Sequence, residues 1–102
     1  MKTYKIKIDG LAEADLQNLF GFLISVMSCI AANKYIDAMV DEVISLSTLA
    51  DLYHPSHYAD ILCYHPCACR MVSHNKRWVY VFHKEEDTVV VDRILPSKMI
   101  RE

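Results

Sequence analysis

The side chains best suited to chemistry lie in the last third of the chain, and several of them are cationic. Arg70 and Arg77 stand in two segments with the alternating pattern of β-strands, and Lys98 follows a third such segment. Successive side chains of a strand point to opposite faces, so both arginines can share one face. Guanidinium groups gathered on one face suit a phosphate or a dianionic transition state. These residues therefore predict a basic surface for a polyanion.

His83 and Arg93 are two further candidate binding residues. His83 falls on the strand face of Arg77 and has the side chain of a general base. It lies about 20 Å from Arg77 along an extended strand at ~3.3 Å per residue, so direct cooperation requires a fold in between. The face of Arg93 depends on the register of the last hairpin, because a one-residue shift moves a side chain to the opposite face.

A run of alternating cysteine and histidine contains only good zinc ligands: Cys63, His65, Cys67 and Cys69. If the run is extended, its ends lie about 20 Å apart, too far to share one ion. The paired C-x-x-C turns of zinc motifs are also missing. We therefore predict no metal site and interpret the cysteines as small, reduced, buried side chains. With only two glycines, a glycine-rich phosphate loop is excluded, and we expect no cofactor.

Charge is divided unevenly along the chain, although the net charge is only −2. Residues 9–62 carry one basic side chain against eight acidic ones, whereas the remaining residues carry ten basic against five acidic. The basic part coincides with the predicted strands and the acidic part with the predicted helices. The sheet would then attract a polyanion, or the charges lie simply where solubility requires them. Both interpretations stay open.

The hydrophobic pattern predicts an α+β domain over residues 1–102. A half-buried strand at 3–8 precedes two helices, at about 11–29 with Asp9 as N-cap and at about 31–49, which form an antiparallel hairpin. An irregular connection at 50–66 leads to an antiparallel meander with strands at about 67–73, 77–83 and 88–95. The helices are expected on one face of the sheet, against the aromatic row Trp78, Tyr80 and Phe82.

The turn between the first two meander strands decides which cations become neighbours. A two-residue turn at His74 and Asn75 would place Arg70 opposite Val79, with Arg77 diagonal to Arg70 on the same face. The aromatic row would then face the helices, and the arginines would gather on the opposite face. That opposite face is the predicted working surface.

Two features concern localisation. Residues 16–33 carry no charge and approach the length of a membrane span, but polar side chains dilute them, and a helix packed on the sheet is favoured. The N-terminal MKTYKIKID alternates and has no apolar leader segment, so we expect a cytoplasmic chain.

The order of elements, together with the stretch RMVSHNKRWVYVFHKEEDTVVVDRILPSKM, resembles the RelE/ParE superfamily, the toxins of type II toxin–antitoxin (plasmid stabilisation) modules. The segment IDGLAEADL resembles the start of the first helix of that family, and RILPSKMI resembles its closing strand and basic turn. The resemblance implies one of two activities. RelE-like members cut messenger RNA on the ribosome with basic side chains, and ParE-like members inhibit DNA gyrase without chemistry of their own.

Carried over by position, Arg70, Arg77 and Lys98 match the basic catalytic residues of RelE-like members. The departures are that the chain ends in KMIRE without the tyrosine or His-Tyr pair common there, that Pro96-Ser97 replaces a glycine, and that Met99 stands where arginine is usual. A missing acid–base group costs a nuclease about 10²–10⁴-fold. These departures and the long apolar hairpin favour a ParE-like gyrase inhibitor, with the RelE-like nuclease as the alternative.

The resemblance also implies a cognate antitoxin, whose acidic or amphipathic segment would cover the basic face or the charge-free helix. A homodimer is a further assembly that the sequence leaves open. Two other classes remain: a non-toxic adaptor of the same fold, and a small nucleic-acid-binding module with salt-dependent affinity. The second is weakened because the aromatic row is committed to the core and is not free to stack on bases.

Overall fold

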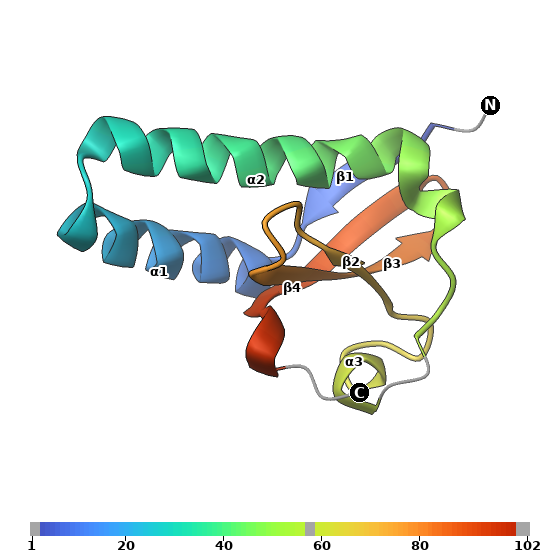
Figure 1. Cartoon of the computed structure of the whole chain (residues 1–102). Coiled ribbons are helices and arrows are strands. Elements are labelled where there is room, and N and C mark those ends of the chain that lie inside the picture. The colour runs from blue at the N-terminus through green and yellow to red at the C-terminus, as the bar shows by residue number, and fades with distance from the viewer. Residues whose placement is uncertain (1–2, 57–58, 100–102) are drawn as a thin grey trace.

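The computed structural model describes residues 3–56 and 59–99, and its centre is a four-stranded sheet in the order β1-β4-β3-β2 (Figure 1). Strand β1 (Lys5–Ile8) pairs parallel to β4 (Thr88–Pro96). Strand β3 (Trp78–Glu85) pairs antiparallel to both β4 and β2 (Cys69–Val72). The predicted N-terminal strand and the antiparallel meander are thus confirmed, with β1 added at the edge of the meander.

Two long helices form the predicted antiparallel hairpin on one face of this sheet. Helix α1 (Gly10–Val26) begins after Asp9, whose carboxylate accepts a hydrogen bond from the Leu11 N–H at 3.2 Å. Helix α2 (Cys29–Leu49) begins after Ser28, whose hydroxyl accepts from the Ala31 N–H at 3.1 Å. Both caps satisfy amide groups that a helix start leaves without partners. The closed end of the hairpin projects beyond the sheet (Figure 1).

The main core lies between the helical hairpin and the sheet. Tyr80 and Phe82 are fully buried there, and Trp78 packs against the same cluster, so the predicted aromatic row faces the helices. Helix α2 supplies the apolar stripe of Met39, Val43 and Leu46 at the expected helical spacing. This interface fixes the position of the sheet relative to both helices.

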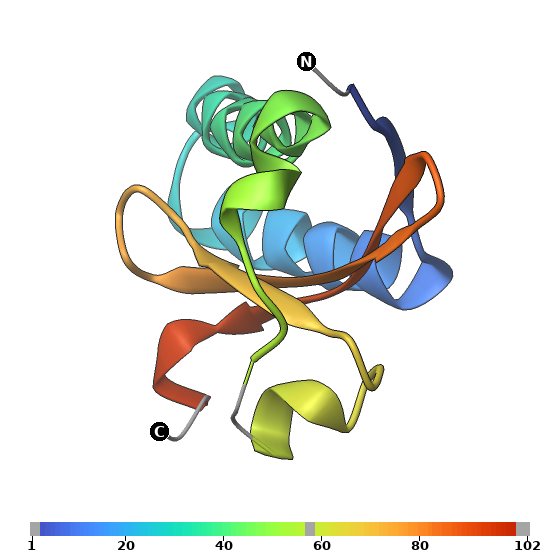
Figure 2. The same cartoon turned by 90° about the vertical axis from the view of Figure 1, so that its right-hand side faces the viewer.

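The opposite sheet face is not the open working surface predicted from the sequence. The predicted connection at 50–66 contains a 3-10 turn at Ala50–Leu52 and a short helix, α3 (Ala59–Leu62), that lies across this face (Figure 2). Val79, Val81 and Leu95 form a second small core there with Ile61 and Ala68. The β-branched side chains on this face are buried because they gain more from apolar contact than from exposure.

The predicted turn between β2 and β3 is wrong by two residues. Val72 pairs with Val79, and Arg70 pairs with Val81, because the loop spans residues 73–77 and not only His74 and Asn75. A shift of two keeps every side chain on its predicted face but changes its neighbours. Arg77 consequently lies in the loop, just before β3 begins.

The prediction against a membrane span agrees with the helices of the structure. In the described part of the chain, no helix combines the length and the apolarity needed to cross a bilayer. Residues 100–102, the last three of the KMIRE segment, lie outside the described residues.

Candidate functional site

A basic pocket lies where β3 begins and β4 ends. It has a volume of about 450 Å³ and is lined by Lys76, Arg77, Trp78, Pro96, Ser97 and Lys98. The Ser97 N–H donates to the Arg77 carbonyl at 2.9 Å, and the Ser97 hydroxyl donates to the Lys76 carbonyl at 2.7 Å. These bonds hold the β2–β3 loop against the segment after β4. Two of the three predicted catalytic residues, Arg77 and Lys98, therefore line one pocket.

The β2–β3 loop is held in place by helix α2. The hydroxyl of Tyr35 accepts from the Trp78 indole N–H at 2.9 Å and from the Asn75 amide at 3.1 Å. The His74 N–H donates to the Glu42 carboxylate at 2.8 Å. Lys76 adopts a positive φ of 63°, which turns the chain into β3. The position of the basic pocket thus depends on two polar side chains of α2.

A second cavity of about 280 Å³ continues from the basic pocket toward helix α1. The two cavities share Trp78 and Pro96. We call them together the composite groove, which is basic at one end and largely apolar at the other. The lining of its α1 end consists of Asp15, Asn18, Leu19, Phe22, Trp78, Ile94 and Pro96. Such a groove offers both charge and apolar contact to one extended or helical ligand.

Arg70 does not line the basic pocket. Its partner across the ladder is Val81, which follows Arg77 by four residues. At ~3.3 Å per residue, Val81 and Arg77 are about 13 Å apart along the chain. The prediction that Arg70 and Arg77 are diagonal neighbours is therefore wrong. The loop that lengthens the turn moves Arg77 away from β2.

Arg93 forms a two-pronged ion pair with Asp15 of α1. Its Nε and one terminal nitrogen donate to the two carboxylate oxygens at 2.8 and 2.9 Å, and the Ile94 N–H donates to the same carboxylate at 2.9 Å. The pairing of Arg93 with Val81 settles the register that the sequence left open. The hydrogen bonds from Arg93 to the Asp15 carboxylate raise the pKa of Arg93 above its usual value. The geometry gives Arg93 a role in joining α1 to the part of β4 that extends beyond its pairing with β1.

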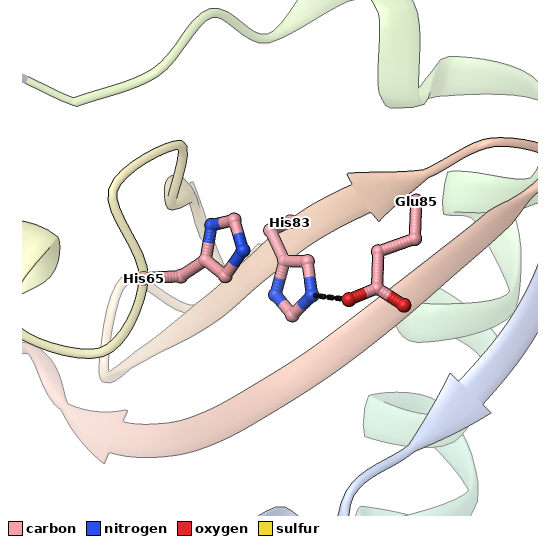
Figure 3. A group of neighbouring side chains, drawn as sticks. All are labelled: His65, His83 and Glu85. Carbon is pink, nitrogen blue, oxygen red and sulfur yellow. Dashed lines mark hydrogen bonds and ion pairs between the residues drawn. The ribbon is translucent and has the colours of Figure 1, made fainter.

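His83 is buried, in contrast to the open position expected of it. Figure 3 shows its ring between His65 and Glu85. Its Nδ1 lies 2.7 Å from Asp92 Oδ2, its Nε2 lies 3.0 Å from Glu85 Oε1, and the His65 ring stacks on it at 3.8 Å. Burial works against the charged form of His83, but the bonds to Asp92 and Glu85 outweigh it and raise the pKa above 6.5. Sequence reasoning missed this cluster. The available signal was the i, i+2 spacing of His83 and Glu85 on one strand face.

The chemical capacity of the basic pocket follows from its lining. Lys76, Arg77 and Lys98 can bind an anion and stabilise negative charge. Among the described lining residues there is no carboxylate, imidazole or phenol that would accept or donate a proton at neutral pH. His83 is held by two carboxylates on the buried face. The described pocket is therefore better equipped for binding than for acid–base chemistry.

Comparison with known proteins gives a structural relative but no sequence relative. No family model matches the chain, and no curated protein matches it. The fold is similar to that of a chain in the solved structure of the "Chromosomal ParDE TA system from P. aeruginosa", with a TM-score of 0.75 and 17% sequence identity. The similarity covers 92% of this chain and 96% of that chain. The RelE/ParE-like fold predicted from the sequence is thereby confirmed.

Proposed function

We propose that this chain is the toxin of a type II toxin–antitoxin module and inhibits growth in a ParE-like way, by binding DNA gyrase in the cytoplasm. The observation that carries the proposal is the similarity, over nearly the full length of both chains, to a chain of a ParDE TA system. Such a likeness concerns the fold, and fold alone does not determine function. The surface chemistry therefore has to choose between the two activities of the family.

The arrangement of cations supports gyrase binding over RNA cleavage. Cleavage of RNA needs a group that moves protons as well as cations that stabilise charge. Arg70 lies apart from the basic pocket, and His83 is buried against Asp92 and Glu85. In the described lining, the charged side chains are all cationic, and no carboxylate or imidazole stands beside them. A binding toxin needs no acid–base group.

The free end of the helical hairpin supplies a second surface for a large protein target. Phe22, Val26 and Ile30 are exposed by 60–72% there, with Phe22 at 61%. Exposed apolar side chains that gather at one projecting end are typical of protein-binding sites. We propose this end as part of the gyrase-binding surface.

The RelE-like alternative is favoured by one specific observation. Arg77 and Lys98, two of the residues carried over from the RelE-like pattern, line the same pocket together with Lys76. Three cations around a messenger phosphate would stabilise the negative charge of a cleavage transition state. This alternative predicts that the pocket, and not the hairpin end, carries toxicity.

The composite groove fits the antitoxin that either activity implies. Its basic end would bind acidic side chains, and its apolar end would receive the apolar face of a helix. An antitoxin segment that is acidic and amphipathic would contact both ends at once. We propose this groove as the antitoxin site.

The test is to induce the chain in bacteria and to follow DNA and protein synthesis by pulse-labelling within minutes. Early loss of DNA synthesis, with inhibition of supercoiling by purified gyrase, supports the ParE-like proposal. Early loss of translation, with rescue by Arg77→Ala or Lys98→Ala but not by the exposed control Lys34→Ala, supports the RelE-like alternative. If neither synthesis falls and growth continues, the toxin proposal is refuted and an adaptor role is favoured.

The hairpin end has its own matched pair of variants. Ile30→Asp places a charge on the proposed gyrase surface, and Leu52→Asp places one on a side chain that is equally exposed but lies after α2. We expect Ile30→Asp to relieve growth arrest and Leu52→Asp to leave it unchanged. Equal toxicity of both variants would remove the hairpin end from the proposal.

A further inference from the structure

The cluster around His83 plays no part in the proposed binding surfaces, yet it brings together ligands that metals prefer. His65 comes from the segment after α3, and His83 and Glu85 come from β3. Their ligand atoms all lie within 4.8 Å of one another. We propose that His65, His83 and Glu85 bind a divalent transition-metal ion of the zinc type.

The donor set is the first argument. Two imidazole nitrogens and one carboxylate are a ligand set that zinc takes in proteins, with a fourth position left for water. At zinc–ligand distances of ~2.0–2.2 Å, tetrahedral ligands lie about 3.3–3.6 Å from one another. The His83 Nε2 and Glu85 Oε1 atoms, 3.0 Å apart, need to separate only slightly to admit an ion. Their i, i+2 spacing keeps both on the same face of β3.

The second argument is the hydrogen bond on the far side of the His83 ring. Asp92 Oδ2 lies 2.7 Å from Nδ1, which fixes the proton on Nδ1 when Nε2 binds a metal. A carboxylate behind a ligating histidine orients the ring and strengthens the ligand. Asp92 is the extra residue at the register shift after Val81 in the β3–β4 ladder, and its side chain lies against the His83 ring.

Charge gives a third argument. Asp92 and Glu85 place two carboxylates against the buried His83 ring, with the Asp92 side chain 15% and the Glu85 side chain 63% exposed. A divalent cation would balance them. The ion takes the place of the proton between His83 Nε2 and Glu85 Oε1, and that proton leaves to the solvent.

Binding requires one local rearrangement at His65. The two imidazole rings are parallel within 1°, so their in-plane lone pairs do not yet converge. Rotation of the His65 ring about its Cβ–Cγ bond aims Nε2 at the ion. It also gives up the hydrogen bond from the Cys67 N–H to Nδ1, at 3.0 Å. The rearrangement stays within one half-buried side chain.

The thiols are the competing ligands that a test must separate. Cys63 and Cys67 are exposed and lie two residues on either side of His65. Exposed thiols bind zinc without any built site. Cobalt distinguishes the two cases, because thiolate ligands add an intense near-ultraviolet charge-transfer band that nitrogen and oxygen ligands lack.

The experiment titrates Zn²⁺ into the purified full chain by calorimetry, with thermal unfolding as the second readout. We expect one saturable site and a higher unfolding midpoint. Glu85→Gln and His65→Gln, both at accessible side chains, should weaken binding at least ~10-fold, and Asp92→Asn about 10–100-fold. The control variants His54→Gln, Glu13→Gln and the double variant Cys63→Ser/Cys67→Ser should bind as the natural chain does.

Three outcomes of the titration would overturn the proposal. The natural chain shows no saturable binding, Glu85→Gln and His65→Gln keep the affinity of the natural chain, or the cysteine double variant loses affinity. Co²⁺ should give the visible absorption of tetrahedral coordination without a thiolate band, and a strong thiolate band would assign the ion to the cysteines. None of these readouts depends on toxicity, so the metal site and the proposed function stand or fall separately.

Discussion

The ion pair between Asp15 and Arg93 gives the sharpest stability prediction. Asp15→Asn keeps the shape of the side chain but removes its charge and one of its two strong acceptor oxygens. In the natural chain the carboxylate accepts three hydrogen bonds, two from Arg93 and one from the Ile94 N–H. The substitution leaves the arginine without a counter-charge at the joint between α1 and β4.

The magnitude follows from burial. The side chains of Asp15 and Arg93 are 16% and 28% exposed, so the pair lies between a surface pair, worth about 0–1 kcal/mol, and a buried pair whose disruption costs about 3–5 kcal/mol. We expect Asp15→Asn to lower the free energy of unfolding by about 2 kcal/mol. For a domain of this size, about 1 kcal/mol corresponds to ~4–8 °C in the unfolding midpoint. The expected shift is therefore about 8–16 °C.

The assay is urea unfolding at neutral pH, with the midpoint and slope compared between variants. Asp87→Asn is the control, because its partner Lys5 is 81% exposed and their closest atoms are 3.8 Å apart. It should cost under about 0.5 kcal/mol. In a double-mutant cycle, Asp15→Asn and Arg93→Ala should be coupled by about 1–2 kcal/mol. Equal effects of Asp15→Asn and Asp87→Asn, or no coupling in the cycle, would refute the reasoning.

Three further predictions concern the core, a thiol and a turn. Phe82→Ala should cost about 3–5 kcal/mol, because the ring is fully buried and packs edge-on against Tyr53; a loss below about 1 kcal/mol in urea unfolding would contradict this. Cys69 should resist alkylation in the native chain while Cys63 reacts, since burial protects the Cys69 thiol and raises its pKa, and mass spectrometry of native labelling would show equal rates if this is mistaken. Lys76→Gly should stabilise the chain by about 0.5–1 kcal/mol in thermal unfolding, because glycine adopts the positive φ of 63° without strain; a destabilised variant would show that the lysine side chain itself holds the loop.

The parts of the fold that periodicity determines could be predicted from the sequence. The hairpin of α1 and α2 and the inward direction of Tyr80 and Phe82 follow from helical and strand spacing, which burial reinforces. The second small core could not be predicted in this way. Val79 and Val81 are covered by Ile61 of α3, which lies in a segment without clear periodicity.

The β2–β3 register shows where local turn rules fail. The dipeptide at His74 and Asn75 favours a two-residue turn, but contacts from α2 select a longer loop. Asn75 donates to Tyr35, which is 40 residues away along the chain, and the His74 N–H donates to Glu42, which is 32 residues away. Local propensity contains no information on these partners. The predicted register places Arg77 in a strand, whereas in the structure Arg77 lies in the loop and lines the basic pocket.

The His83 cluster was out of reach of sequence reasoning for a related reason. In the sequence, the candidate ligands stand close together, from Cys63 to Cys69, whereas the structure gathers His65, His83 and Glu85 from two distant segments. The register shift that frees Asp92 depends in turn on the pairing of β3 with β4. Of these relations, the sequence contains only the i, i+2 spacing of His83 and Glu85, which places both on one strand face.

The sheet keeps the two candidate sites physically separate, and this separation makes the proposals testable one at a time. The composite groove lies where β3 begins and β4 ends and extends toward α1. Its position depends on Tyr35 and Glu42 of α2, which hold the β2–β3 loop. The His83 cluster lies farther along β3, on the face that α3 covers. Sites that share no contacting residues are expected to respond additively to substitution. Glu85→Gln should therefore leave antitoxin binding unchanged, and Lys98→Ala should leave zinc binding unchanged.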